Sequence, residues 1–133
     1  MTKLRFMQTA AALLIVCGLN LTSHAQRGRE VYLGEAHVDG NADHDKISVG
    51  KSEGIFNSLQ IRVDRAPIEF NRVEVHYGNG SSEDLSIKQR LRPGERTRWI
   101  DLRGHDRAIS SVEFWYEKAN WGSNRPRLRL YGR

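Results

Sequence analysis

Residues 55–80 read IFNSLQIRVDRAPIEFNRVEVHYGNG, and apolar residues occupy every second position through most of this stretch. Leu59, Ile61 and Val63 alternate with polar residues, which is typical of a β-strand with one face in a core and the other in solvent. Further along the chain, Leu85 and Ile87 alternate with polar residues in the same way. Beyond residue 25, no window long enough for a helix carries the i, i+3, i+4, i+7 spacing of an amphipathic helix. The stretch therefore predicts an all-β protein.

The alternation changes phase in two places. Between Phe70 and Val73 the apolar positions slip by one residue, and a β-bulge near residues 71–72 would keep both halves of the strand facing the core. Gly34 marks a similar slip after an earlier apolar pair. We therefore expect irregular strands that keep a constant buried face.

Turn residues separate the alternating runs. Gly78-Asn79-Gly80 predicts a tight hairpin, and Pro93-Gly94 suits the centre of a type II turn. Short strands at this spacing favour an antiparallel β-sandwich resembling a jelly roll, with a β-barrel as the alternative. The eight expected strands lie near residues 30–38, 46–50, 55–64, 68–77, 83–90, 96–102, 109–118 and 126–131.

The first 25 residues have the order of parts of a secretory signal peptide. Lys3 and Arg5 precede an apolar run over residues 10–19, and Ser23-His24-Ala25 ends the segment with small residues at the cleavage positions. We expect cleavage after Ala25 and export to the periplasm or the extracellular space. The apolar run is too short for a transmembrane anchor.

Residues 26–133 are then expected to form one domain. This part contains no cysteine, because Cys17 lies in the leader, so its stability has to come from the core and not from disulfides. It carries 19 basic and 16 acidic residues, a net charge of +3, and the positive excess lies in residues 65–133. Residues 88–107 carry seven basic and three acidic residues. This run is either a solvated sheet face or a basic patch that suits an anionic envelope polymer or a lipid head group.

The C-terminal stretch EFWYEKANWGSNRPRLRLYGR, residues 113–133, holds the candidate binding residues. On the expected strand 109–118, Trp115 points away from the core, and a hairpin with strand 126–131 would place Arg127 or Arg129 over its ring. Such a cross-strand ladder explains these residues without a ligand. The alternative is a binding face that includes both arginines.

Trp121 lies in the loop between these strands, where no alternation accounts for it. Beside Asn120 and Asn124, its ring could stack on a sugar while the two amides bond the sugar hydroxyls. The ring could equally fold down and close the open end of the sandwich, because burial gains apolar area. Both interpretations remain open from the sequence.

The run HVDGNADHD, residues 37–45, places oxygen side chains at every second position, as calcium-binding loops do. The match ends there, because His44 stands where such loops have glycine and Gly50 where they have glutamate. We therefore expect a plain polar turn without a cofactor, in which the side chains bond to nearby backbone, and a calcium site or a zinc site that includes the histidines is the alternative. The candidate ligands are Asp39, Asn41, Asp43 and Asp45.

No motif of a serine or cysteine nucleophile, a zinc protease or a phosphate-binding loop is present, so no catalytic residue is predicted. We expect a monomeric, non-enzymatic binding module at the cell envelope, with an anionic glycan, a lipid head group or a protein as its partner. The alternative is a calcium- or zinc-dependent hydrolase that uses residues 37–45. A nucleic-acid-binding module comes third, and the expected export argues against it.

Four segments together resemble a family of small exported bacterial β-proteins classified as a domain of unknown function. The segments are VDGNADHDKISVGKSEG (38–54), VEVHYGNG (73–80), RWIDLRGHDRAISSVEFWY (98–116) and LYGR (130–133). The resemblance implies a signal peptide and an all-β domain. It implies no activity, cofactor or site residue.

Overall fold

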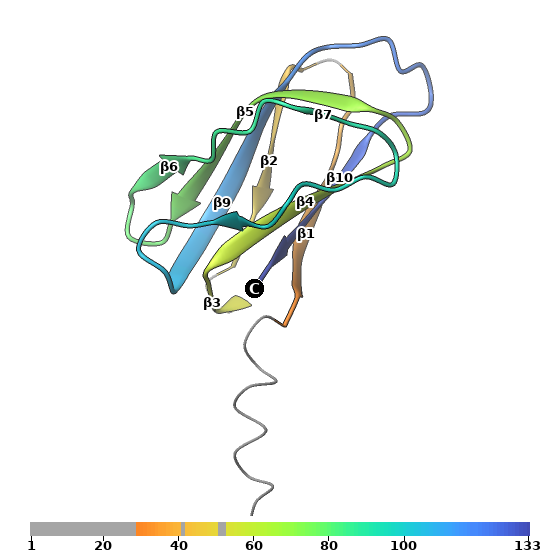
Figure 1. Ribbon diagram of the computed structural model, residues 1–133. Coiled ribbons are helices and arrows are strands. Elements are labelled where there is room, and N and C mark those ends of the chain that lie inside the picture. The colour runs from red at the N-terminus through yellow and green to blue at the C-terminus, as the bar shows by residue number, and fades with distance from the viewer. Residues whose placement is uncertain (1–28, 41, 51–52) are drawn as a thin grey trace, which may run out of the picture.

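The computed structural model describes residues 29–40, 42–50 and 53–133 (Figure 1). The predicted signal peptide lies outside these residues. The described part forms strands and no α-helix, and so holds no helix long and apolar enough to cross a membrane. The strands are β1 (Val31–His37), β2 (His44–Ser48), β3 (Ile55–Phe56), β4 (Ser58–Asp64), β5 (Ile68–Tyr77), β6 (Ser82–Asp84), β7 (Arg90–Leu91), β8 (Ile100–Asp101), β9 (Arg107–Tyr116) and β10 (Arg127–Gly132).

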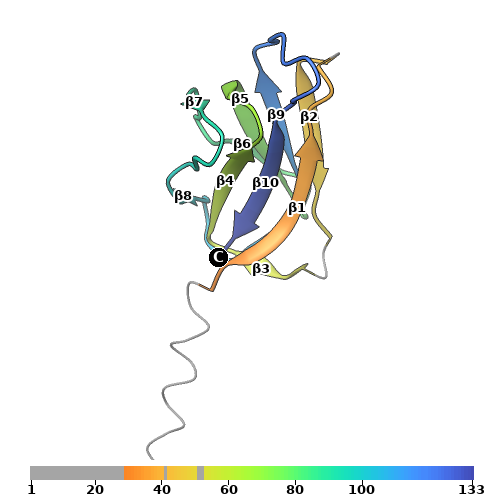
Figure 2. The ribbon, with the colours of Figure 1, turned by 90° about the vertical axis from the view of Figure 1, so that its right-hand side faces the viewer.

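Two antiparallel sheets face each other (Figure 2). The first sheet has the order β1-β10-β4-β8. The second has the order β2-β9-β5-β6, with β3 added to β9 and β7 added to β5. The sheets stay separate over the described residues, which confirms the expected β-sandwich and not the alternative of a closed barrel.

Apolar side chains from both sheets fill the space between them. The largest fully buried ones are Tyr116, Phe70, Phe114, Leu59 and Ile61. Two glycines allow the sheets and their edges to approach. A Cβ on Gly132 would lie 2.7 Å from Phe56 Cδ1, and one on Gly34, whose φ is +146°, would lie 2.8 Å from Ile47 Cγ2.

The two predicted phase changes are confirmed. The register between β5 and β9 shifts between Phe70 and Arg72, and the register between β1 and β10 shifts between Tyr32 and Gly34. The alternation on either side of each shift keeps its apolar residues inside, as a bulge requires.

Two predicted strands are interrupted. The run 55–64 divides at Asn57 into β3 and β4, which pair with different sheets. The run 83–90 leaves the sheet after Asp84, because Ser86 adopts a left-handed φ of 57° and donates its backbone N–H to Asp84 Oδ1 at 2.7 Å. Leu85 and Ile87 are nevertheless buried. The alternation therefore predicted burial there correctly and regular strand pairing wrongly.

The predicted hairpin between the last two long strands is wrong, because β9 and β10 belong to opposite sheets. The connection between them, residues 117–126, crosses from one sheet to the other. The β1–β2 and β4–β5 connections also cross between the sheets. All three crossings lie at the same end of the sandwich (Figures 1 and 2).

Candidate ligand groove

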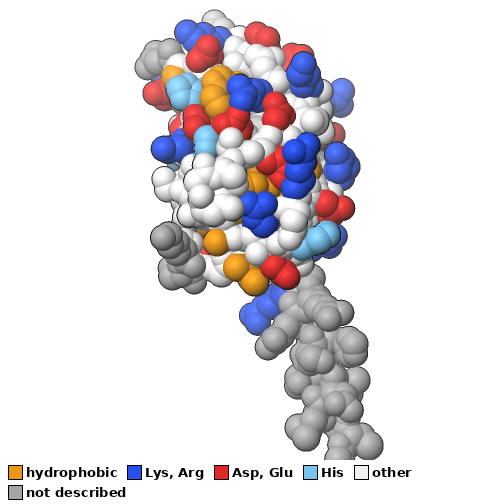
Figure 3. Space-filling model, turned by 90° about the vertical axis from the view of Figure 1, so that its left-hand side faces the viewer, with side chains coloured by type: hydrophobic (Ala, Val, Ile, Leu, Met, Phe, Trp, Pro, Cys, Tyr) orange, Lys and Arg blue, Asp and Glu red, His pale blue; other side chains and the backbone are white. Residues whose placement is uncertain are grey.

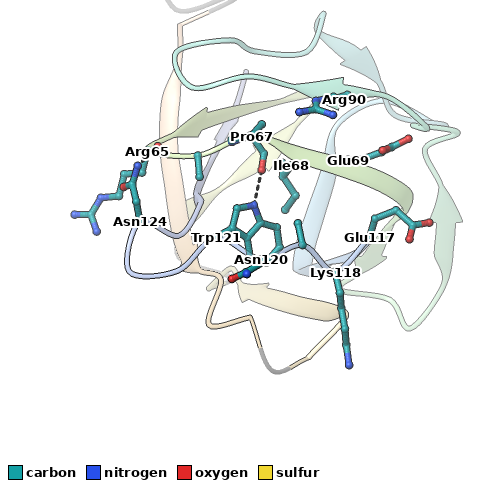
Figure 4. A pocket seen from close by; sticks show the side chains of 12 residues that line it. Arg65, Pro67, Ile68, Glu69, Arg90, Glu117, Lys118, Asn120, Trp121 and Asn124 are labelled. Carbon is teal, nitrogen blue, oxygen red and sulfur yellow. Dashed lines mark hydrogen bonds between the residues drawn. The ribbon is translucent and has the colours of Figure 1, made fainter.

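The three crossing connections enclose three adjoining hollows at this end of the sandwich. Their volumes are about 460, 170 and 350 Å³. The largest, here called the Trp121 groove, lies between the β4–β5 turn, β7 and the β9–β10 loop (Figure 4). It is lined by Arg65, Ala66, Pro67, Ile68, Glu69, Arg90, Glu117, Lys118, Ala119, Asn120, Trp121 and Asn124.

Trp121 is held at the wall of this groove. Its indole Nε1 donates a hydrogen bond to the Pro67 carbonyl oxygen at 2.9 Å (Figure 4). Its ring meets the Tyr116 ring edge-on, with the centroids 6.2 Å apart, and is partly buried against the core. The structure thus combines the two interpretations of Trp121, because the ring folds onto the end of the sandwich and still lines an open groove.

The two asparagines predicted as binding residues line the groove beside Trp121. Asn124 Nδ2 donates to the Arg65 carbonyl oxygen at 2.7 Å, which ties the β9–β10 loop to the β4–β5 turn. Asn120 is exposed and lines both the groove and the smallest hollow. Asn120 is therefore the amide that is available to a ligand, whereas Asn124 mainly shapes the wall.

Five charged side chains surround the Trp121 groove, and all are exposed. Arg65, Arg90 and Lys118 supply positive charge, and Glu69 and Glu117 supply negative charge. Arg65 has a left-handed φ of 76°, a strained conformation for a residue with a side chain, at the turn where β4 ends. A wall of this kind can donate hydrogen bonds to anionic groups and accept them from hydroxyls.

Arg127 and Arg129, also predicted as binding residues, are not brought together with Trp121. Both lie on the outer face of the first sheet, where each forms an ion pair with Asp64. Arg127 stands directly opposite Asp64 in the register of β10 and β4. These two arginines therefore belong to a cross-strand ladder of the first sheet.

Trp115 has the kind of cross-strand contacts that were predicted, but from other partners. Arg72 of β5 lies over its ring, with Cζ 4.9 Å from the centroid, and the His44 ring of β2 stacks on it at 5.6 Å. Next to it, His76 Nε2 lies 2.8 Å from Glu113 Oε1. Histidines and charges of both signs interleave on this face (Figure 3). Because these groups bind one another, the face is a structural ladder.

The predicted metal ligands are only partly described, since Asn41 lies outside the described residues. Asp39 lines the two smaller hollows, and Asp45 Oδ1 accepts a hydrogen bond from Lys46 N at 3.1 Å. In the described part, no three histidine, aspartate or glutamate side chains converge on a place for a metal ion. The plain polar turn therefore remains our prediction for this segment, and calcium binding remains the alternative.

The acidic segment does affect a buried neighbour. The Tyr116 hydroxyl is buried and has no hydrogen-bond partner among the described residues. Burial raises the pKa of Tyr116 to about 12, and the carboxylates of Asp45, Asp39 and Asp43 add to the effect. A neutral hydroxyl is favoured there because a phenolate would be desolvated next to negative charge.

Residues 10–132 match the family described as "Domain of unknown function (DUF2541)". The chain belongs to the DUF2541 family. This confirms the resemblance to a domain of unknown function and assigns no activity to the DUF2541 fold. Among curated proteins, none matches the sequence.

Two solved structures are distantly similar to this DUF2541 chain. One comes from "Structural and functional characterization of Pseudomonas aeruginosa AlgX", with 11% identity and a TM-score of 0.49 over 96% of this chain and 33% of that chain. The other is the structure of the infectious bursal disease virus Gx strain, with 11% identity and a TM-score of 0.33 over 77% of this chain and 31% of that chain. The DUF2541 chain thus spans about a third of each, and similarity this low carries no argument about function.

Proposed function

We propose that this DUF2541 protein is a non-enzymatic binding module of the cell envelope that holds an acidic glycan in the Trp121 groove. The proposal depends on the fixed Trp121 ring at the wall of an open groove, which three exposed cationic and two exposed acidic side chains surround. The expected signal peptide supports the location, because export would bring the protein to acidic polymers of the envelope.

The indole suits a sugar ring. The C–H groups of a sugar face form an apolar surface that packs on an aromatic ring, while its hydroxyls need polar partners at the rim. The Trp121 N–H already donates to Pro67, and the ring already packs on Tyr116, so the orientation is set before a ligand arrives. A preorganised ring spares the ligand the entropic cost of ordering it.

The charges around the groove favour a glycan that carries negative groups. Arg65, Arg90 and Lys118 can form charge-assisted hydrogen bonds to a carboxylate or sulfate. Glu69 and Glu117 can accept hydrogen bonds from hydroxyl groups. An acidic sugar uses both kinds of side chain, and its ring face also packs on the indole, a contact that a lipid head group without a sugar ring does not offer.

Calorimetric titration with galacturonate oligosaccharides tests the proposal. Trp121→Ala should weaken binding by about tenfold or more, since the loss of one aromatic contact is worth about 1.4 kcal/mol or more. Lys118→Ala, a change of an exposed side chain at the same groove, should also weaken binding and provides a variant with little risk of unfolding.

Arg103→Ala is the matched control. Arg103 precedes β9, at the opposite end of the sandwich from the groove, and its side chain is 85% exposed, so this variant should bind as the wild type does. If the wild type binds and both Trp121→Ala and Lys118→Ala bind with the same affinity, the proposal is overturned. Binding to anionic phospholipid vesicles without binding to any acidic oligosaccharide would overturn it in favour of a lipid.

A further inference from the structure

We infer that the ligand is a linear acidic polysaccharide that runs from the Trp121 groove into a second subsite beside Arg125. The inference rests on the proposed function and extends it from a single sugar to a chain of linked sugars. The second subsite, here called the Arg125 hollow, has a volume of about 350 Å³. It is lined by His37, Val38, Asp39, Arg65, Ser123, Arg125 and Pro126.

The Trp121 groove and the Arg125 hollow are neighbours, because Arg65 lines both. Asn124 forms the wall of the groove and Ser123 that of the hollow, so the β9–β10 loop borders both subsites. On the other side of this loop, the smallest hollow shares Trp121 with the groove and Arg125 with the hollow. The three hollows therefore neighbour one another around the loop, from β7 to the end of β1, and together are called the depression here.

Arginine side chains line each part of the depression. Arg90 lines the groove, Arg65 lies at the junction and Arg125 lines the far hollow. Arg65 and Arg90 form no ion pair with a carboxylate among the described residues. Arg125 Nε donates to the Gly122 carbonyl oxygen at 3.4 Å, which holds the guanidinium stem against the loop. A guanidinium has five N–H donors, so most remain for a ligand.

This arrangement differs from the arginines of the first sheet face. Arg62, Arg127 and Arg129 are each bound by a carboxylate, Glu30 in the first case and Asp64 in the other two. The outer face of the first sheet therefore neutralises its own charge, whereas the end of the sandwich leaves Arg65 and Arg90 to an outside partner. A chain with one negative group on each sugar unit would meet successive arginines along the depression.

The size of the depression argues for more than one sugar unit. The Trp121 groove alone, at about 460 Å³, falls within the usual range for a small-molecule site. A small ligand there would leave the Arg125 hollow empty, whereas a linked unit would reach it at high effective concentration. Affinity should therefore rise with chain length until both subsites are filled.

Calorimetry with galacturonate disaccharide and octasaccharide tests this inference. For the wild type we expect the octasaccharide to bind about a hundredfold more tightly than the disaccharide. Arg125→Ala should lose most of that gain, with a much smaller effect on the disaccharide, because Arg125 does not line the groove. Trp121→Ala should weaken binding of both, and Arg103→Ala should retain the full gain.

The outcomes separate the two proposals. If the wild type binds neither oligosaccharide, the proposed function itself fails. If it binds both with equal affinity, or if Arg125→Ala keeps the full gain with length, the extended path is wrong while the Trp121 groove stands. An equal gain with neutral glucose oligosaccharides of the same lengths would overturn the acidic character of the ligand.

Discussion

Deleting one hydroxyl from Tyr77 or from Tyr116 should change stability in opposite directions, because only one of the two hydroxyls has a partner. The tyrosines lie on neighbouring strands of the second sheet and are 3% and 1% exposed, respectively. The Tyr77 hydroxyl donates to the Glu83 carboxylate. The Tyr116 hydroxyl is buried without a hydrogen-bond partner among the described residues.

The structure sets the size of each effect. A hydrogen bond to a charged group contributes about 1.5 to 3 kcal/mol. Glu83 is 10% exposed and retains the backbone N–H of Arg103 at 3.1 Å after the change, so Tyr77→Phe should cost about 2 kcal/mol, within that range. Tyr116→Phe removes an unsatisfied polar group and should be neutral or stabilising by up to about 1 kcal/mol.

The pH dependence gives a second readout. Burial raises the pKa of both tyrosines, that of Tyr116 to about 12, whereas a tyrosine in the unfolded chain ionises near 10. Between those pH values the unfolded state binds fewer protons, so stability falls as pH rises from about 10 to about 12. Below pH 10 both states are protonated at these groups, and the full stability is present. Tyr116→Phe should make the alkaline decline shallower.

Urea unfolding of the wild type and both variants, followed by tryptophan fluorescence at neutral and alkaline pH, measures these differences. If the slope of unfolding free energy against urea concentration is the same for the wild type and the variants, the substitutions change stability and not the compactness of the folded or unfolded state. A loss of stability in Tyr116→Phe as large as that in Tyr77→Phe would contradict this prediction, because it would mean that the Tyr116 hydroxyl has a partner in the folded protein.

Three further outcomes are expected. Trp115→Ala should cost about 1 kcal/mol through the lost Arg72 contact, and Arg72→Ala should shift the tryptophan emission; no shift would contradict the ladder. Gly132→Ala should cost about 1 to 3 kcal/mol in thermal melts, because its Cβ would overlap Phe56; an unchanged melting temperature would contradict this. For residues 39–45, we expect equal melting temperatures with calcium and with chelator; a calcium-dependent rise would establish a site.

Burial of individual residues was predicted from the sequence more accurately than the pairing of strands. Alternation placed Leu85 and Ile87 in the core even where the chain leaves the sheet, because burial follows the phase of the side chains. It placed Trp115 outward but gave it the wrong partners. Residues 117–126 could turn back within one sheet or cross to the other sheet. The choice depends on the packing of the whole sandwich, so the local sequence pattern does not predict it.

Of the residues that line the candidate groove, only those on the β9–β10 loop were predicted as binding residues. Trp121 and its neighbouring asparagines were recognisable because no alternation explains a tryptophan in a polar loop. Pro67, which accepts the indole hydrogen bond, lies 54 residues earlier in the chain. Arg65 and Arg90 come from two other segments. Arg90 belongs to the basic run at residues 88–107, but nothing in the sequence placed either arginine beside Trp121. Sequence spacing alone could not bring these three segments to the same end of the sandwich.

The fluorescence of Trp121 itself reports whether the ligand lies in the Trp121 groove. The chain has three tryptophans, so the variant Trp99→Phe/Trp115→Phe reports only from the groove. Titration with the galacturonate octasaccharide should change its emission in a saturable way, with the same dissociation constant that calorimetry gives. Saturable heat of binding with no change in Trp121 emission would place the ligand elsewhere on the protein and contradict binding in the Trp121 groove.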